Sequence, residues 1–154
     1  MNRIGKGIVA GLAALGMAGA APASAEDAGT AEKLRQLDIM LMVTSLRCRT
    51  TPDNFQPEFQ RFEATHLETL NQAAREMRNG LVAQYGLAGA NRALDRMSTV
   101  MANQYGRGHP WLGCAELKVT TRILSNIQGR QALAEAADQL LAPESGGTLA
   151  YARR

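Results

Sequence analysis

One stripe of apolar residues at helical spacing constrains the fold of this chain more than any other feature. Its members follow one another at steps of three or four residues: Phe55, Phe59, Phe62, His66, Leu70, Ala73, Met77 and Leu81. Such steps place every member on one face of an α-helix. No stretch of the chain alternates apolar and polar residues as a half-buried strand would. The sequence therefore predicts an all-α protein.

The residues around this stripe predict where its helix begins and ends. Asp53 or Asn54 would cap the N-terminus, Gly80 would allow a bend at a cost of about 1 kcal/mol, and Gly86 would stop the helix in a left-handed conformation. A following helix is expected over 88–105. Its apolar stripe consists of Ala90, Leu94, Met97, Met101 and Tyr105.

Three further helices are expected on either side of these two. The first covers 30–49 and should be central, because residues 39–43 are all apolar. Another begins at Pro110 and pauses at Gly129, with the stripe Leu112, Ala115, Val119, Ile123 and Ile127. A last helix over 131–142 uses Leu133, Ala136, Leu140 and Leu141. Because the connections are short, neighbours should pack antiparallel, which gives a bundle of four to five helices.

The N-terminus has the pattern of a cleavable export signal. Arg3 and Lys6 precede an apolar run from Ile8 to Ala21, and the small residues of Ala23-Ser24-Ala25 follow. The run is shorter than the roughly 20 residues that span a bilayer. We therefore expect a signal peptide over 1–25, a helical domain over 26–143 and a flexible tail over 144–154. Export would make the protein periplasmic or secreted, and an uncleaved membrane anchor is the alternative.

The charge balance excludes two classes of protein. The chain has 17 Lys and Arg and 14 Asp and Glu. Because Arg3 and Lys6 lie in the predicted leader, the mature chain would carry 15 basic against 14 acidic residues. Such a balance argues against a basic nucleic-acid-binding protein and against an acidic disordered one. We expect no nucleic-acid partner and, after cleavage, no integral membrane segment.

The two cysteines follow from the expected compartment. Cys48 and Cys114 are an even pair in a chain bound for an oxidising environment, which favours a disulfide between them. The chain-entropy estimate for a loop of this length is about 4 kcal/mol. Two separate buried thiols, or a Cys–His catalytic pair, are the alternatives.

The segment 106–114 contains the single tryptophan and one of the two histidines. A Cys48–Cys114 bond would place Arg47 and Arg49 beside Arg107, His109 and Trp111. Cations, an imidazole and an indole would then meet at the start of a helix, where an anionic or aromatic ligand could bind. The alternative is that Trp111 covers the core and the arginines serve a helix end.

Motifs for metal binding and catalysis are incomplete. Glu63 and His66 form one Glu-x-x-His step, of which di-iron bundles need two, and two histidines are too few for zinc. We expect no metal, no cofactor and no catalytic residue. His66 is expected to be partly buried and hydrogen-bonded to Glu63 or to a helix neighbour.

Several stretches resemble a family of short, exported bacterial proteins without an established activity. They include 37–49, 54–56, 66–71, 92–96 and 104–117, and the likeness covers Leu34 to Ile127. Some members carry the name S-adenosyl-L-homocysteine hydrolase. This chain differs from the genuine hydrolases in its length, its export signal and its lack of a nicotinamide-binding fingerprint, so the resemblance implies no catalytic residue. Its architecture is also similar to that of small periplasmic acid chaperones and helical immunity proteins.

Three hypotheses for function follow. The first is a non-enzymatic periplasmic module that binds a partner protein or a small anionic or aromatic envelope ligand at Arg47, Arg49, Arg107, His109 and Trp111. The second is an envelope chaperone that exposes apolar surface on acidification. The third is a hydrolase in which Glu63 with His66, or His109, transfers protons.

Overall fold

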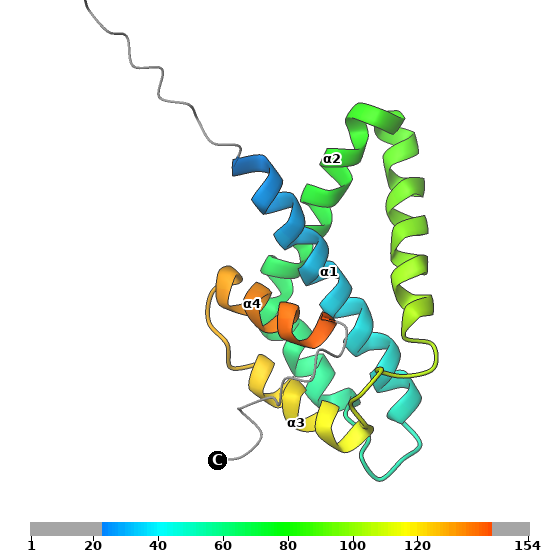
Figure 1. Cartoon of the computed structure of the whole chain (residues 1–154), viewed down its shortest axis with the longest axis vertical. Coiled ribbons are helices and arrows are strands. Elements are labelled where there is room, and N and C mark those ends of the chain that lie inside the picture. The colour runs from blue at the N-terminus through cyan, green and yellow to red at the C-terminus, as the bar shows by residue number, and fades with distance from the viewer. Residues whose placement is uncertain (1–22, 143–154) are drawn as a thin grey trace, which may run out of the picture.

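A computed structural model describes residues 23–142 and shows four α-helices (Figure 1). Helix α1 covers Ala23–Cys48, α2 covers Gln56–Gln104, α3 covers Cys114–Leu124 and α4 covers Arg130–Leu141. There is no strand between residues 23 and 142. The predicted all-α class and the predicted number of helices are confirmed.

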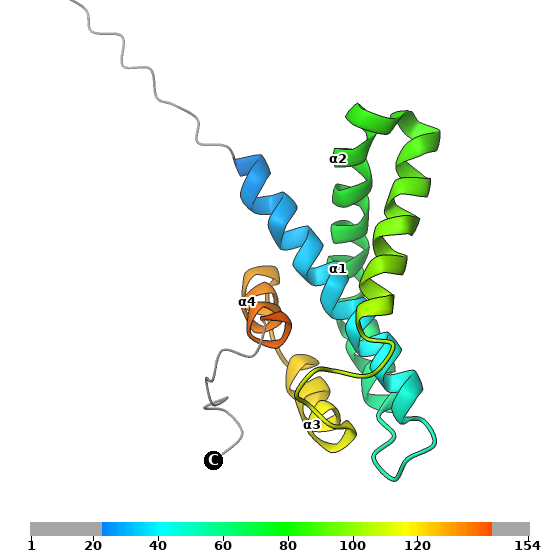
Figure 2. The same ribbon diagram turned by 45° about the vertical axis from the view of Figure 1, so that its right-hand side comes forward.

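Helix α2 is a hairpin of two limbs, because its backbone reverses at Gly86. This glycine has φ 67° and ψ 172°, a combination that only glycine adopts without strain. The first limb (56–85) and the second limb (87–104) correspond to the two helices expected on either side of Gly86. Helix α1 crosses this hairpin obliquely, and its N-terminal end separates from the two limbs (Figures 1 and 2).

The apolar stripes predicted for the two limbs of α2 pack against apolar residues of α1 in the core. Every member of the first-limb stripe is buried except Leu81, which is partly exposed at the far end. In α1, Leu34, Leu37 and the run 39–41 are buried, whereas Met42 is 39% exposed, so this helix contributes one broad face to the core and is not covered on all sides. Burial of these side chains supplies most of the apolar area removed from water, the dominant favourable contribution to folding.

The stripe predicted for α3 is wrong. Val119 is 54% exposed and Ile123 is 48% exposed, whereas Leu117, Thr121 and Leu124 are buried. The physical reason is the disulfide. Cys48 and Cys114 are joined, with 5.7 Å between their Cα atoms, so the helix face that carries Cys114 turns inward. The helix also begins at Cys114, four residues later than Pro110 predicted.

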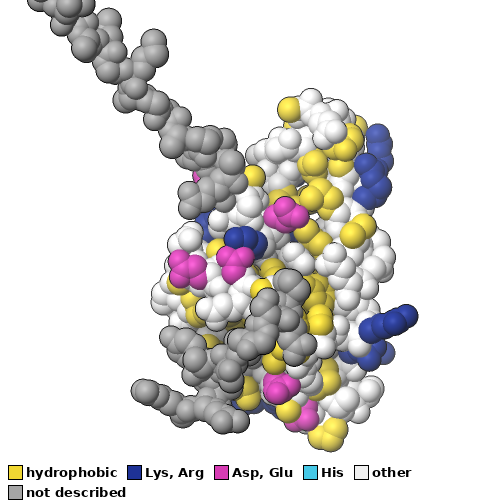
Figure 3. Space-filling model, viewed as in Figure 1, with side chains coloured by type: hydrophobic (Ala, Val, Ile, Leu, Met, Phe, Trp, Pro, Cys, Tyr) yellow, Lys and Arg dark blue, Asp and Glu magenta, His cyan; other side chains and the backbone are white. Residues whose placement is uncertain are grey.

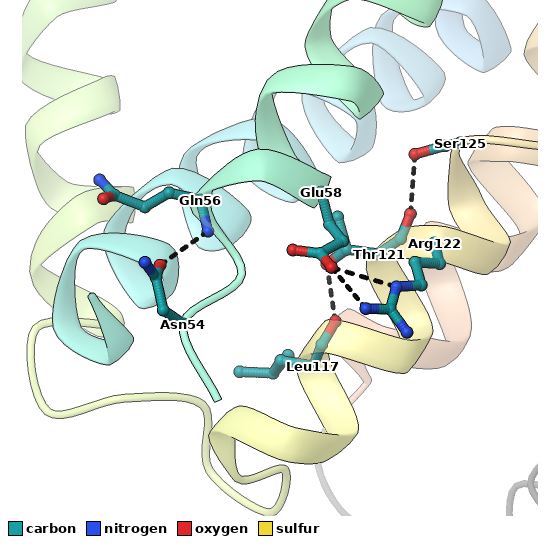
Figure 4. Close-up of polar contacts among 7 residues, drawn as sticks. All are labelled: Asn54, Gln56, Glu58, Leu117, Thr121, Arg122 and Ser125. Atoms are coloured by element: carbon teal, nitrogen blue, oxygen red, sulfur yellow. Dashed lines mark hydrogen bonds and ion pairs between the residues drawn. The ribbon is translucent and has the colours of Figure 1, made fainter. Parts of the chain in front are cut away.

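Polar contacts hold α3 against α2 (Figure 4). Arg122 donates from Nε and Nη2 to Glu58 Oε1, at 3.1 and 2.6 Å. Burial raises the pKa of Glu58, but the hydrogen bonds and charge of Arg122 outweigh it, so the pKa lies below its usual value. The hydroxyls of Thr121 and Ser125 donate to carbonyls of their own helix.

The start of α2 has a side-chain hydrogen bond from one of the two expected residues. Asn54 Oδ1 accepts from the Gln56 N–H, so Asn54 rather than Asp53 serves the start of α2.

Predictions about both termini lie mainly outside the described residues. Residues 1–22 of the predicted leader (1–25) and all of the predicted tail (144–154) lie outside the described range. Cleavage after Ala25 would fall in the first turn of α1, which begins at Ala23. Within residues 23–142, no helix is long and apolar enough to cross a membrane.

Candidate functional site

The disulfide brings the end of α1 beside the segment 105–113, as expected. Arg47 Nη1 donates to the Gly106 carbonyl at 2.9 Å. Its guanidinium also lies against Gly108, whose φ of 107° belongs to a glycine conformation. Arg47 therefore ties the loop to α1, and part of its hydrogen-bonding capacity is already used within the protein.

His109 is buried, and backbone groups occupy both of its ring nitrogens. The N–H groups of Trp111 and Leu112 lie 3.4 and 3.2 Å from Nδ1. Because backbone N–H groups can only donate, Nδ1 is an acceptor, and Nε2 carries the proton donated to the Leu140 carbonyl at 3.1 Å. Burial lowers the pKa of His109, although the bond to Leu140 and the charge of Glu116 oppose this. The ring is thus neutral, and it joins the loop to α4.

The remaining predicted site residues are Trp111, Arg49 and Arg107. The indole of Trp111 packs edge-on against the His109 ring, with 4.5 Å between centroids, and is half-buried. Arg49 and Arg107 are exposed, and neither forms an ion pair with another residue of the range 23–142. Arg49, Arg107 and the exposed part of Trp111 are therefore the predicted site residues whose side chains remain open to solvent.

His66 has a different partner from the expected one. It is buried, and its Nε2 donates to the carbonyl of Leu124 at 2.9 Å, across the interface between α2 and α3. The expected bond to Glu63 or to a neighbour on the same helix is wrong. The signal was absent from the local sequence, because the partner lies 58 positions away.

A groove between α1 and the two limbs of α2 is the feature that sequence reasoning missed. Its volume is about 330 Å³. Leu81 and Tyr85 of the first limb, and Met97, Val100 and Met101 of the second, provide its apolar lining. Apolar side chains are visible along this face in Figure 3. The sequence does contain one signal of it: Tyr85 and Val100 are large apolar residues of α2 that belong to neither core-facing stripe, so they are available to line a surface groove.

Polar groups frame the groove. Glu32 and Gln36 of α1 face Arg96 and Gln104 of the second limb. Gln36 Nε2 donates at 3.2 Å to both Gln104 Oε1 and the Tyr105 hydroxyl oxygen, which links α1 to the second limb at one end of the groove. Glu32 and Arg96 form no ion pair with residues 23–142. The groove thus combines an apolar lining with a few polar groups at its edge, a combination typical of small-molecule sites.

A polar cluster lies between α1 and α2. Arg35 donates to Asp38 Oδ2 at 3.3 Å and to Ser98 Oγ at 3.4 Å, while its buried Nε has no partner. The pKa of Asp38 is raised to about 6, chiefly by burial. The charge of Arg35 opposes this rise, and the charge of Glu63 adds to it. Burial also raises the pKa of Glu63. This cluster joins α1 to the second limb of α2.

The described residues hold no group of three His, Cys, Asp or Glu side chains that could bind a metal ion. No protein-family model, curated protein or solved structure matches the chain. The resemblance to exported two-cysteine proteins therefore stays an expectation, and function has to be argued from the geometry.

Proposed function

We propose that this chain is a non-enzymatic, exported binding module that holds an apolar ligand in the groove between α1 and α2. The observation that carries the proposal is the apolar lining of a cavity of about 330 Å³. This volume is at the lower end of the range for small-molecule sites, which is roughly 300–1,000 Å³. The ligand class that fits is a small apolar molecule or a single alkyl chain with a polar end.

Two further properties of the groove support this proposal. Val100 is 59% exposed and Tyr85 is 44% exposed, so the lining leaves large apolar groups in water until something covers them. Met97 and Met101 have flexible, polarisable side chains, which adapt to ligands of different shape. The predicted leader and the disulfide support the exported location, because disulfides persist in oxidising compartments.

The test uses two valines of similar exposure on different faces. Val100 lines the groove, whereas Val119, which is 54% exposed, lies on α3. We expect Val100→Asp to weaken binding of the apolar dye N-phenyl-1-naphthylamine about tenfold, since a charge would be buried against the ligand. Val119→Asp should leave binding unchanged. Equal dye binding by both variants, or no binding by the natural chain, would contradict the proposal.

The corner formed by Arg49, Arg107 and Trp111 stays a predicted second contact surface, for an anionic or aromatic ligand. Trp111 fluorescence, titrated with envelope extract, reports on this corner. The double variant Arg107→Ala and Trp111→Ala lacks this indole, so it is compared with the natural chain by pull-down from envelope extract. If it captured every partner that the natural chain captures, the corner would not be a binding surface. The groove proposal does not depend on that outcome.

A second candidate function, an acid-responsive chaperone, is favoured by the buried neutral His109. The folded pKa of His109 lies below the unfolded value of 6.5. Its contribution to stability is therefore complete above pH 6.5 and is lost as the pH falls below that value. Binding of an apolar dye that rises between pH 7 and pH 2, together with protection of client proteins from aggregation, would support this function. No feature of the described residues favours a hydrolase.

A further inference from the structure

The longest uncharged stretch of α2 lies where the hairpin turns. Residues 79–91 contain no Asp, Glu, Lys, Arg or His. Gly86 turns the backbone at the centre of this segment, so both limbs contribute to one end of the molecule (Figures 1 and 2). We name residues 79–91 the tip.

Apolar side chains at the tip point into water. Leu87 is 66% exposed, more than any other large apolar side chain of the described residues, and Tyr85 is 44% exposed. Ala83 and Ala88 are exposed beside them. Together with the exposed Tyr85, Ala83 and Ala88, this leucine gives the end of the hairpin an apolar, uncharged surface that does not contribute to the core.

Three arginines flank the tip in the sequence. Between Met77 and Met97 the charged residues are Arg78, Arg92, Asp95 and Arg96, three cations and one anion. Arg78 Nε donates to Asn91 Oδ1 at 2.6 Å and so joins the two limbs. Figure 3 shows Lys and Arg side chains beside the second limb, below an end of the molecule that is white and yellow.

The spacing between the apolar end and the cations matches the depth of a membrane interface. Arg92 follows Gly86 by six residues, which is about 9 Å along a helix, and Arg96 follows it by about 15 Å. Interfacial helices bury their apolar face about 5–10 Å into the boundary between headgroups and acyl chains. With Leu87 at that depth, the long side chains of Arg92 and Arg96 reach the phosphates.

We propose that the tip docks on the surface of an anionic lipid bilayer, with Leu87 and Tyr85 in the interface and Arg78, Arg92 and Arg96 against the headgroups. Charge complementarity favours an anionic lipid surface over an uncharged one. Tyr85 fits the same position, because its ring is apolar and its hydroxyl remains hydrated. The apolar area is small, so docking is reversible and needs both the apolar and the basic contribution.

This docking does not require a ligand in the groove, although the two surfaces share residues. Tyr85 of the tip and Arg96 next to it also line the groove. A docked molecule would therefore hold the groove close to the acyl chains of the bilayer.

The experiment is flotation of the full chain with vesicles, after mass spectrometry has established which N-terminus it carries. Vesicles of phosphatidylcholine alone are compared with an equal mixture of phosphatidylcholine and phosphatidylglycerol. We expect binding to the anionic vesicles, and its loss at high salt. Each arginine near an anionic surface raises the binding constant about fivefold. The double variant Arg92→Ala and Arg96→Ala should therefore bind the anionic vesicles about 30-fold more weakly.

Two leucine variants distinguish membrane binding by the tip from binding by another part of the chain. Leu87→Asp should weaken vesicle binding at least about tenfold. Leu67→Asp should leave it unchanged, since Leu67 is 57% exposed on the same helix but lies 20 positions away. Equal binding by both variants would place any membrane contact elsewhere, residues 1–22 included, and would overturn the proposal. Capture of an envelope protein without vesicle binding would overturn it too.

A reporter at the tip keeps the proposal testable if Leu87→Asp does not fold. Leu87→Trp, in a Trp111→Phe background, places the sole indole at the tip. Its emission should shift to the blue with anionic vesicles and be quenched by brominated lipids. An unshifted emission would show that the tip stays in water and would overturn the proposal. The vesicle assay contains no dye and the dye assay no vesicles, so the tip and groove proposals fail separately.

Discussion

Each of the two histidines donates a hydrogen bond to a backbone carbonyl at the end of a short helix. His66 bonds to Leu124, the last residue of α3, and His109 bonds to Leu140, the next-to-last residue of α4. The last carbonyls of a helix have no partner within it. His109 supplies a partner for the Leu140 carbonyl from the loop. His66 adds a second bond from α2 to the Leu124 carbonyl, which also accepts from the Ile127 N–H at 3.1 Å. Both histidines therefore attach a short helix to the rest of the core.

Substitution of His109 tests this role. His109→Leu should lower the free energy of unfolding by about 3 kcal/mol, because it leaves the Leu140 carbonyl and the Leu112 N–H buried without partners. His109→Asn should cost about half as much, since its amide oxygen can still accept from the N–H groups that Nδ1 serves. Urea unfolding at neutral pH, followed by circular dichroism, measures both. Equal losses would mean that the loop contacts of Nδ1 contribute nothing.

Substitution of Asp38, whose carboxyl is buried, is expected to raise the free energy of unfolding at neutral pH, whereas substitution of His109 lowers it. Its pKa is about 6 in the folded state, against the ordinary value of 3.8 for an aspartate in the unfolded chain. A raised carboxyl pKa contributes most stability below pH 3.8, and this contribution is lost as the pH rises through about 6. Asp38→Asn should therefore stabilise the protein at neutral pH by about 1–3 kcal/mol, with Arg35 losing a charged partner.

Unfolding measured across the pH range distinguishes this effect from general changes in charge. The difference between Asp38→Asn and the natural chain should shrink to nothing below pH 3.8. Glu32→Gln provides the control, because Glu32 is an exposed acid on the same helix. A constant difference at every pH would show that Asp38 does not titrate as its burial implies.

At the scale of elements, Gly86 decides whether α2 is a hairpin. Gly86→Ala should destabilise the protein by about 1–3 kcal/mol, because φ 67° with ψ 172° strains any residue with a side chain. Gly80→Ala is the matched control, with helical backbone and no atom within 4 Å of an added Cβ. It should stabilise by about 0.5–1 kcal/mol. Thermal unfolding compares them, and two shifts of the same sign would contradict the role given to Gly86.

The elements differ in how far the sequence predicts them. The stripe of the first limb is long and regular, so both its helix and its buried face follow from spacing alone. In α3, two faces compete: Ala115, Val119 and Ile123 are more apolar than Leu117, Thr121 and Leu124. The covalent bond at Cys114 selects the second face, and Thr121 becomes suitable for the core because its hydroxyl bonds to the Leu117 carbonyl.

At the scale of the whole molecule, the sequence predicts the corner around the disulfide but not the groove. The corner follows from one pairing, Cys48 with Cys114, which brings Arg47 to the Gly106 carbonyl. The groove depends on how far α1 diverges from both limbs of α2, and no local pattern encodes that angle. The role of His109 was also hidden, because its partner Leu140 lies 31 positions away.

The disulfide joins the end of α1 to the start of α3 and encloses all of α2 in its loop. For 66 residues, the chain-entropy estimate is about 4 kcal/mol, a large part of the 5–15 kcal/mol that is usual for a domain. The double variant Cys48→Ala and Cys114→Ala should therefore unfold at a much lower urea concentration. It should remain helical without urea, because Leu117, Leu124 and the Glu58–Arg122 pair still hold α3.

Reduction of the natural chain measures independently how much the disulfide contributes to the free energy of unfolding. A thiol reductant should lower its urea midpoint to that of the double variant and leave the variant unaffected. Both samples lose the same constraint on the unfolded chain, so their free energies of unfolding should agree within the error of extrapolation. A natural chain that contains two free thiols, or whose midpoint does not respond to reduction, would remove the explanation for the inward face of α3 as well.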